Sequence, residues 1–144
     1  MSEIIFKIAS TEEEIIAARN IRKNVFVLEQ GIPEELDTDE DDERSIHLLA
    51  LGIDPRFIGT GRLTINQDAG VLSRISVIKQ YRNRGVGKLI LLELERIARQ
   101  KGLRSLTLAP HEYLENFYAA LGYKKNDSEK IVGKYKLLSM TKLI

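Results

Sequence analysis

The stretch 75–88 constrains the fold of this chain more than any other part of its 144 residues. It reads ISVIKQYRNRGVGK: a short apolar run, a turn with two glycines, and the start of a helix that we expect to end at about Lys101. Gly85 and Gly87 allow the backbone to approach an anion without a Cβ in the way, and the first N–H groups of a helix have no partner within it. The pattern predicts a cradle for a phosphate group.

Basic side chains surround this predicted turn. Arg82, Arg84 and Lys88 can supply countercharge to a phosphate. In the alternative interpretation the glycines only serve the turn and the basic side chains are solvated. Two other phosphate-binding motifs, G-x-x-x-x-G-K-[ST] and G-x-G-x-x-G, are absent from the sequence, which argues against a nucleotide triphosphatase and a Rossmann dehydrogenase.

The run Arg82-x-x-Gly85-x-Gly87 resembles the acyl-CoA signature of the GNAT family of N-acetyltransferases, R/Q-x-x-G-x-G/A. The resemblance implies acetyl-CoA as co-substrate and a fold in which the strands around the cradle, here 72–78 and 103–109, splay apart to admit the pantetheine arm. Main-chain groups of two strand residues would hold that arm as an added strand pairs with a sheet edge. The cofactor-binding residues implied are Ile75, Ser76, Val77, Arg82, Asn83, Arg84, Gly85, Val86, Gly87 and Lys88.

Length and composition bound the remaining possibilities. We expect one domain, 1–144, with a core of its own. The absence of cysteine excludes a disulfide framework and a thiolate metal site, and no metal is predicted. A net charge of +1 argues against a nucleic-acid partner. The chain shows neither a signal-peptide pattern nor the roughly 20 apolar residues of a membrane span, so we expect a cytoplasmic protein; a homodimer is left open.

Hydrophobic periodicity predicts alternating strands and helices. Ser10 and Thr11 followed by Glu14 form a capping box that starts the first helix. The expected elements are a strand at 3–9, a helix from 10 to about 28, strands at 44–51, 56–66 and 71–78, a helix at 86–101, a strand at 103–109, a helix at 110–121, and a hairpin of 123–125 with 134–143. The GNAT resemblance implies this same order and an α/β (α+β) fold, with a mixed, mostly antiparallel sheet flanked by helices.

A second segment, 116–123, reads NFYAALGY and resembles the family pattern F-Y-x-x-L-G-F/Y. The resemblance implies that the hydroxyl of Tyr118 faces the thioester sulfur and acts as the catalytic acid. A phenol with a pKa of about 10 stays protonated at neutral pH and can give a proton to a leaving thiolate. In the alternative interpretation Phe117 and Tyr118 are core aromatic residues of an amphipathic helix.

A third segment, 22–30, reads RKNVFVLEQ and resembles a subgroup of small GNAT proteins in which it borders the acceptor pocket. Glu29 is then a candidate catalytic base and substrate-binding residue. Arg22 is a candidate substrate-binding residue that pairs with Glu29 or with an acceptor carboxylate. The alternative is that Arg22 is a salt-bridged helix residue and Glu29 a solvated one.

The two histidines carry less information. His47 is expected to be structural, and His111 is a weaker candidate for a base or a helix cap. The subgroup commonly has a histidine in its final hairpin and a polar residue at the end of the fifth strand, where this chain has Leu137 and Ala109. Acceptor specificity is therefore not carried over.

The segment 34–43 is almost entirely acidic, since only Leu36 and Thr38 are uncharged. Like charges repel, so we expect first an extended, solvated loop. The second interpretation is a mouth that attracts a cationic amine. A calcium loop of the EF-hand type fits worst, because a central glycine and a terminal glutamate are not in the required places.

Together these features predict an N-acetyltransferase that moves the acetyl group of acetyl-CoA to a primary amine by direct attack in a ternary complex. A strand amide near Val77 would stabilise the oxyanion. The acceptor can be a small amine, a polyamine, an amino sugar or a peptide amine. The alternatives are a non-catalytic acyl-CoA-binding module and a protein-interaction module on the same fold.

Overall fold

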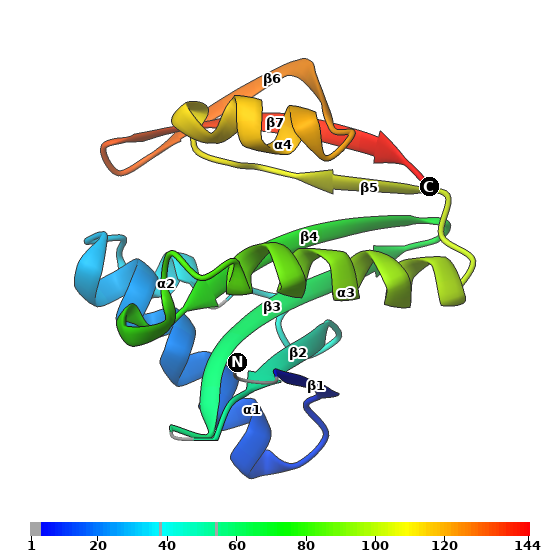
Figure 1. Ribbon diagram of the computed structural model, residues 1–144. Helices are drawn as coiled ribbons and strands as arrows, with labels where there is room; N and C mark the ends of the chain where they lie inside the picture. The colour runs from blue at the N-terminus through cyan, green and yellow to red at the C-terminus, as the bar shows by residue number, and fades with distance from the viewer. Residues whose placement is uncertain (1–3, 38, 54) are drawn as a thin grey trace.

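The computed structural model describes residues 4–37, 39–53 and 55–144. Its elements follow the predicted order and are β1 Ile5–Ile8, α1 Glu12–Arg22, η1 Lys23–Glu29, α2 Glu34–Asp37, β2 Ile46–Leu51, β3 Phe57–Asn66, β4 Ala69–Val77, η2 Lys79–Tyr81, α3 Val86–Gln100, β5 Ser105–Leu108, η3 Glu112–Leu114, α4 Glu115–Ala120, β6 Lys124–Val132 and β7 Tyr135–Leu143. The strands form one seven-stranded sheet in the order β1-β2-β3-β4-β5-β7-β6 (Figure 1). Neighbouring strands are antiparallel except for β4 and β5, so the predicted fold class is confirmed.

Helices cover both faces of the sheet (Figure 1). Successive strand residues point to opposite faces, and β2 shows the consequence. Leu48 and Ala50 join the hydrophobic cluster under α3, whereas Leu49 joins the cluster under α1. The strand is therefore apolar on both sides.

Two glycines of β3 determine how closely α3 approaches the sheet. A Cβ on Gly59 would lie 2.8 Å from Ile90, and a Cβ on Gly61 would lie 2.8 Å from both Ile90 and Leu94. Such distances are below normal packing contacts, so a side chain at either position would have to displace Ile90 or Leu94 of α3. This close packing fixes α3, and with it the turn from which α3 begins.

The first helix starts as predicted but turns from an α-helix into a π-helix. Thr11 and Glu14 form the expected capping box. Beyond Arg22 the chain continues as the π-helix η1 rather than as regular α-helix, and Gln30 donates its N–H to the carbonyl of Val25 at 3.1 Å, five residues back. Gly31, with φ +73°, then ends the helix.

The middle of the sheet opens into a gap. β4 and β5 pair only over Ala69–Val71 and Ser105–Thr107, after which they diverge. A bulge in β4 accompanies the divergence, because the register with β3 shifts between Thr60 and Arg62, and Arg74 has a φ of +57°. The predicted splaying of the strands around the cradle is confirmed.

Candidate active site

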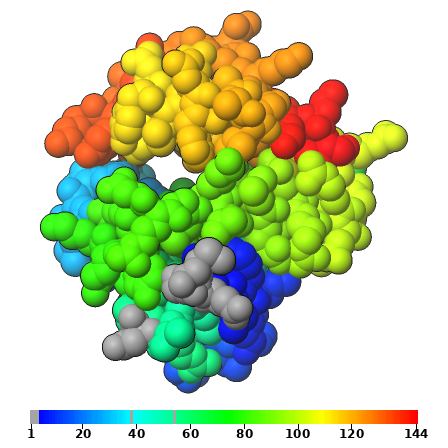
Figure 2. All heavy atoms as spheres, in the orientation of Figure 1, coloured from blue at the N-terminus to red at the C-terminus, as the bar shows by residue number. Residues whose placement is uncertain are grey.

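A cavity of about 620 Å³ fills the gap between the two diverging strands. Its walls come from residues 71–75 of β4, the segment 107–111 at and after the end of β5, η1 and α2 with the turn between them, and the β6–β7 hairpin. Figure 2 shows the molecule hollowed between the part that carries α4 and the part that carries α3 and η1. A substrate in this cavity would touch segments that lie far apart in the sequence.

The predicted cradle lies at the start of α3. Asn83 and Gly85 have φ values of +63° and +77°, which turn the chain sharply. The first helical bond runs from Leu89 N–H to the carbonyl of Gly85 at 3.1 Å, so the N–H groups of the three preceding residues have no partner within the helix. Gly85 provides no side-chain cap, and a Cβ on it would meet nothing within 4 Å. The arrangement suits an anion.

The basic side chains of the cradle are not equivalent. Arg84 and Lys88 are exposed, and the guanidinium of Arg84 lies 5.1 Å from the ring centre of Tyr81. Arg82 donates from Nε to the carbonyl of Val77 at 2.9 Å, and its two Nη atoms bind the carboxylate of Glu29 at 2.6 Å each. Val86 is a core residue, so it can serve a ligand only through its backbone.

The end of β4 directs main-chain groups toward the gap. Val77 is paired with Gly59, and the adjacent Ile78 donates its N–H to the carbonyl of Ile58 at 3.0 Å. In antiparallel sheets this pattern makes Val77 and Gly59 a non-hydrogen-bonded pair, so the N–H and carbonyl of Val77 point away from β3. Ile75 lines the cavity, whereas Ser76 is buried and paired with Thr60.

Tyr118 lines the cavity from α4. Its ring makes edge contacts with Phe117 and Tyr123, with ring centres 5.0 and 6.1 Å away. Burial raises the pKa of Tyr118 above its ordinary value, so the phenol is protonated at neutral pH. Phe117 is 44% exposed and is not a core residue.

Glu29 and Arg22 lie in surroundings that differ from the predicted ones. Glu29 is absent from the described residues that line the cavity, and the Arg82 hydrogen bonds lower the pKa of its carboxyl group. Arg22 is buried; its Nη1 donates to Asp42 at 2.6 Å and its Nη2 to the carbonyl of Asp37 at 3.2 Å. The predicted pairing of Arg22 with Glu29 is therefore wrong, and the alternative of a salt-bridged helix residue is correct.

The acidic segment is folded rather than extended, which corrects the first expectation for it. Its start forms α2, and Asp37 and Asp42 are buried. Arg62 donates to both carboxylate oxygens of Asp39 at 2.8 and 3.0 Å and to Asp42 at 3.2 Å, and Arg74 donates to the carbonyl of Asp37 at 3.1 Å. Buried charges need such partners. Residue 38 lies outside the described residues.

Sequence reasoning missed Arg62 and Arg74, both of which line the cavity. The available signal was the presence of single arginines within two otherwise weakly charged strands, β3 and β4. A charged residue in a buried strand requires a counter-charge, and the acidic segment supplies it.

The two histidines differ in position. His47 is buried against the carbonyl of Asp42, 2.8 Å from its Nε2, and does not line the cavity in the described structure. His111 lines the cavity, with its ring between Tyr113 and Tyr135 at centre distances of 5.2 and 4.7 Å. Its Nδ1 is buried without a hydrogen-bond partner, and burial lowers the pKa of the imidazole.

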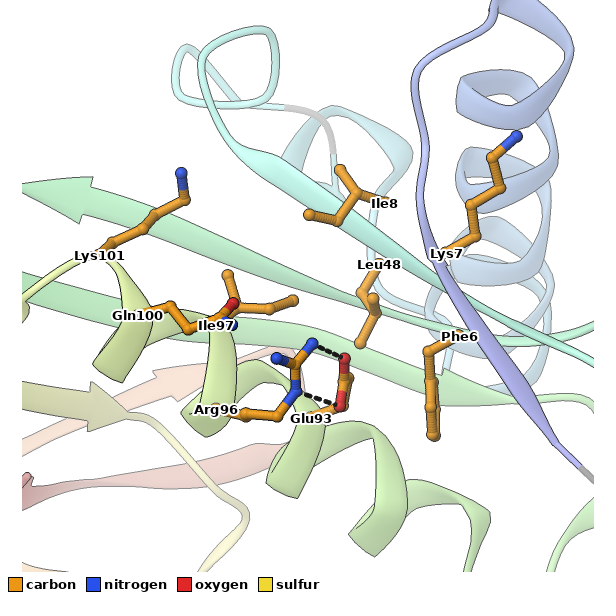
Figure 3. Close-up of a pocket in the computed structure, with 9 residues that line it drawn as sticks. All are labelled: Phe6, Lys7, Ile8, Leu48, Glu93, Arg96, Ile97, Gln100 and Lys101. Carbon is orange, nitrogen blue, oxygen red and sulfur yellow. Dashed lines mark hydrogen bonds and ion pairs between the residues drawn. The ribbon is translucent and has the colours of Figure 1, made fainter.

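A smaller cavity of about 360 Å³ lies between β1 and α3 (Figure 3). It contains the ion pair of Glu93 with Arg96, whose distances are 2.9 and 2.5 Å. None of the predicted site residues lines it. Within the described ranges no cluster of histidine and acidic side chains is placed to hold a metal ion, and no helix is long and apolar enough to cross a membrane.

Comparisons with known proteins agree with this geometry. Residues 15–123 match the acetyltransferase (GNAT) family. The uncharacterized N-acetyltransferase YjcF of Bacillus subtilis (strain 168) is 36% identical over 118 residues, which is 81% of this chain and 83% of YjcF.

Solved structures share the fold. An acyl-CoA N-acyltransferase from Pseudomonas aeruginosa superposes with a TM-score of 0.86 at 21% identity, covering 99% of both chains. PaiA N-acetyltransferase from Thermoplasma acidophilum, solved in complex with coenzyme A, gives a TM-score of 0.71 at 22% identity and also covers 99% of both chains. The chain belongs to the acetyltransferase (GNAT) family, which confirms the expected transferase class and acetyl-CoA as its co-substrate.

Proposed function

We propose that the protein transfers the acetyl group of acetyl-CoA to a primary amine by direct attack in a ternary complex. The observation that supports this proposal most strongly is the gap that opens where β4 and β5 diverge. The cavity within it is lined by both Tyr118 and His111, and β4 runs on from the gap toward the cradle at the start of α3, although none of the described cradle residues 82–88 lines the cavity. The coenzyme A bound to PaiA N-acetyltransferase, which has the same fold, supports the use of this gap by a CoA thioester.

In this proposal the cradle and the end of β4 hold the cofactor. The N–H groups at the start of α3 bind the pyrophosphate, with Arg84 and Lys88 as countercharge. The main chain of Ile75 binds the pantetheine arm as an added strand would, while the carbonyl of Val77 accepts from Arg82 Nε at 2.9 Å. The N–H of Val77 then stabilises negative charge on the thioester oxygen during attack.

Two side chains transfer protons in this proposal, one as an acid and one as a base. The amine nitrogen attacks the thioester carbon, the C–S bond breaks as the tetrahedral intermediate collapses, and Tyr118 gives its phenolic proton to the thiolate. The nitrogen loses its excess proton as it becomes an amide, and that proton restores the Tyr118 phenol, directly or through solvent. The acceptor must first lose a proton, since a lysine-like amine has a pKa of about 10.4. His111 is the base best placed to take it, because it lines the cavity and its lowered pKa keeps the imidazole neutral.

Initial-rate kinetics with acetyl-CoA and a panel of amines, followed by detection of the released thiol, test the proposal. Direct attack predicts intersecting double-reciprocal lines and no acetylated enzyme in mass spectra taken without acceptor. Parallel lines with an acetyl-enzyme would contradict direct attack. Binding of CoA without turnover of any amine would favour the non-catalytic module.

A further inference from the structure

The ion pair between Glu29 and Arg82 joins two walls of the proposed site. Glu29 is the last residue of η1, and Arg82 follows η2 at the entrance to the cradle. Both carboxylate oxygens are bound, each at 2.6 Å from a different Nη atom. Such bidentate pairs hold two groups in a fixed orientation as well as attracting them.

Across its described length, the π-helix η1 contains no buried residue. Each of its seven residues is at least partly exposed, so little burial holds it in place. Val25 and Phe26 of η1 nevertheless line the cavity, as does Gln30 directly after it. Runs of π-helix are rare and are found mostly where function requires them. The cavity wall that η1 forms therefore depends on how the end of η1 is anchored.

The same guanidinium also contacts the end of β4, which in the proposed function lies beside the thioester. Its Nε donates to the carbonyl of Val77 at 2.9 Å. Glu29 orients Arg82, and Arg82 orients the end of β4. One carboxylate thus acts on both sides of the site without lining the cavity itself.

We propose that Glu29 is a positioning residue that anchors the η1 wall of the acceptor site to the CoA cradle through Arg82. This inference rests on the proposed function, because it assigns a role within the same site. It replaces the role of base that the sequence suggested for Glu29. Both carboxylate oxygens are occupied by Arg82, and the resulting low pKa makes the carboxylate a weaker base than an ordinary glutamate.

Glu29→Gln tests the assignment, because it removes the charge and the bidentate geometry while keeping the size of the side chain. For a positioning residue we expect the KM of the amine to rise roughly 2- to 5-fold, the upper part of the range for loss of an exposed ion pair. We expect kcat at saturation to change less than about twofold, with an unchanged pH profile. A kcat that falls by roughly 10²-fold or more, with an altered pH profile, would overturn the proposal in favour of a base.

Hydrogen exchange gives a readout that is independent of turnover. We expect Glu29→Gln to speed amide exchange in 23–30, and unchanged exchange there would overturn the proposal. Glu34→Gln is the matched control, since it removes the same charge from a second ion pair of η1, Lys23 with Glu34 at 3.3 Å between exposed side chains. We expect this control to leave the KM of the amine unchanged. If Glu34→Gln raised KM as much as Glu29→Gln does, the result would count against a specific anchor at Glu29.

A double-mutant cycle with Arg82→Gln completes the test. The second substitution should add little to the effect of Glu29→Gln on exchange in η1, because either one breaks the same contact. Additive effects would overturn the proposal. A wild-type enzyme that acetylates no amine would count against the proposed function, whereas the exchange measurements would still decide the role of Glu29.

Discussion

The cradle at 82–88 and the acidic segment at 34–43 both carry dense charge, yet they are built in opposite ways. The cradle is made of main-chain N–H groups at the start of α3, and two of its basic side chains are exposed. In the acidic segment, the buried carboxylates of Asp37 and Asp42 pair with arginines from α1, β3 and β4. The comparison teaches that charge density by itself does not indicate a ligand site. Charge that is already paired inside the protein stabilises the fold, and unpaired main-chain donors are what a ligand can use.

The largest expected effect comes from breaking the paired region. Arg22→Ala removes the nearest cation of the buried Asp42, at 2.6 Å, and one of the two arginines 3.5 Å from the buried Asp37. We expect the free energy of unfolding to fall by about 3–5 kcal/mol. Urea unfolding measures the change. Arg96→Ala, which breaks the exposed ion pair with Glu93, should lower the free energy of unfolding far less. Equal losses for the two variants would show that burial of the ion pair does not matter.

The next largest effect is expected in the proposed active site, where Tyr118 transfers a proton. Tyr118→Phe keeps the ring but removes the proposed acid, so kcat should fall by roughly 10²-fold while acetyl-CoA affinity is retained. Tyr123→Phe is an informative comparison, because the Tyr123 hydroxyl donates to the buried Glu95 at 2.7 Å. It should cost about 1–3 kcal/mol of stability with little change in kcat. If Tyr118→Phe kept the full kcat while the chemical step was rate-limiting, Tyr118 would not be the acid and would serve only in packing.

A bulky residue in the cradle should produce a smaller but selective loss. A Cβ on Gly87 would meet only Val77 at 3.9 Å, an ordinary contact, so Gly87→Leu should fold. We expect the Kd of CoA to rise at least about tenfold, because the new side chain occupies the space of the pyrophosphate. Calorimetry measures the affinity and urea unfolding the stability. Unchanged affinity would show that the phosphates bind elsewhere.

The smallest effect is expected from the solvent-facing acidic side chains. Glu35, Glu40 and Glu43 are exposed, and replacing all three with glutamine should change kcat/KM for a cationic amine by less than about twofold. Rates at low and high salt, with a neutral amine as control, measure the effect. A larger loss that is confined to cationic acceptors and disappears at high salt would revive the interpretation of the segment as an amine-attracting mouth.

The sequence alone determined the features that depend on near neighbours. The order of elements, the capping box of Thr11 and Glu14, and the strand–turn–helix around Gly85 follow from periodicity and from residues a few positions apart. The family followed as well, because its motifs are local. β6 was predicted too short because nearly all its side chains are exposed, and such a strand shows no apolar alternation.

Tertiary structure decided which charges pair. Arg22 and Glu29 are seven positions apart in one helical segment, yet the fold directs Arg22 to Asp42 and Glu29 to Arg82, 53 residues away. The approach of His111 and Tyr118 to one cavity likewise depends on the divergence of β4 from β5. Ion pairs and cavities join residues that are distant in the chain, and the desolvation that selects between partners exists only once the core has closed.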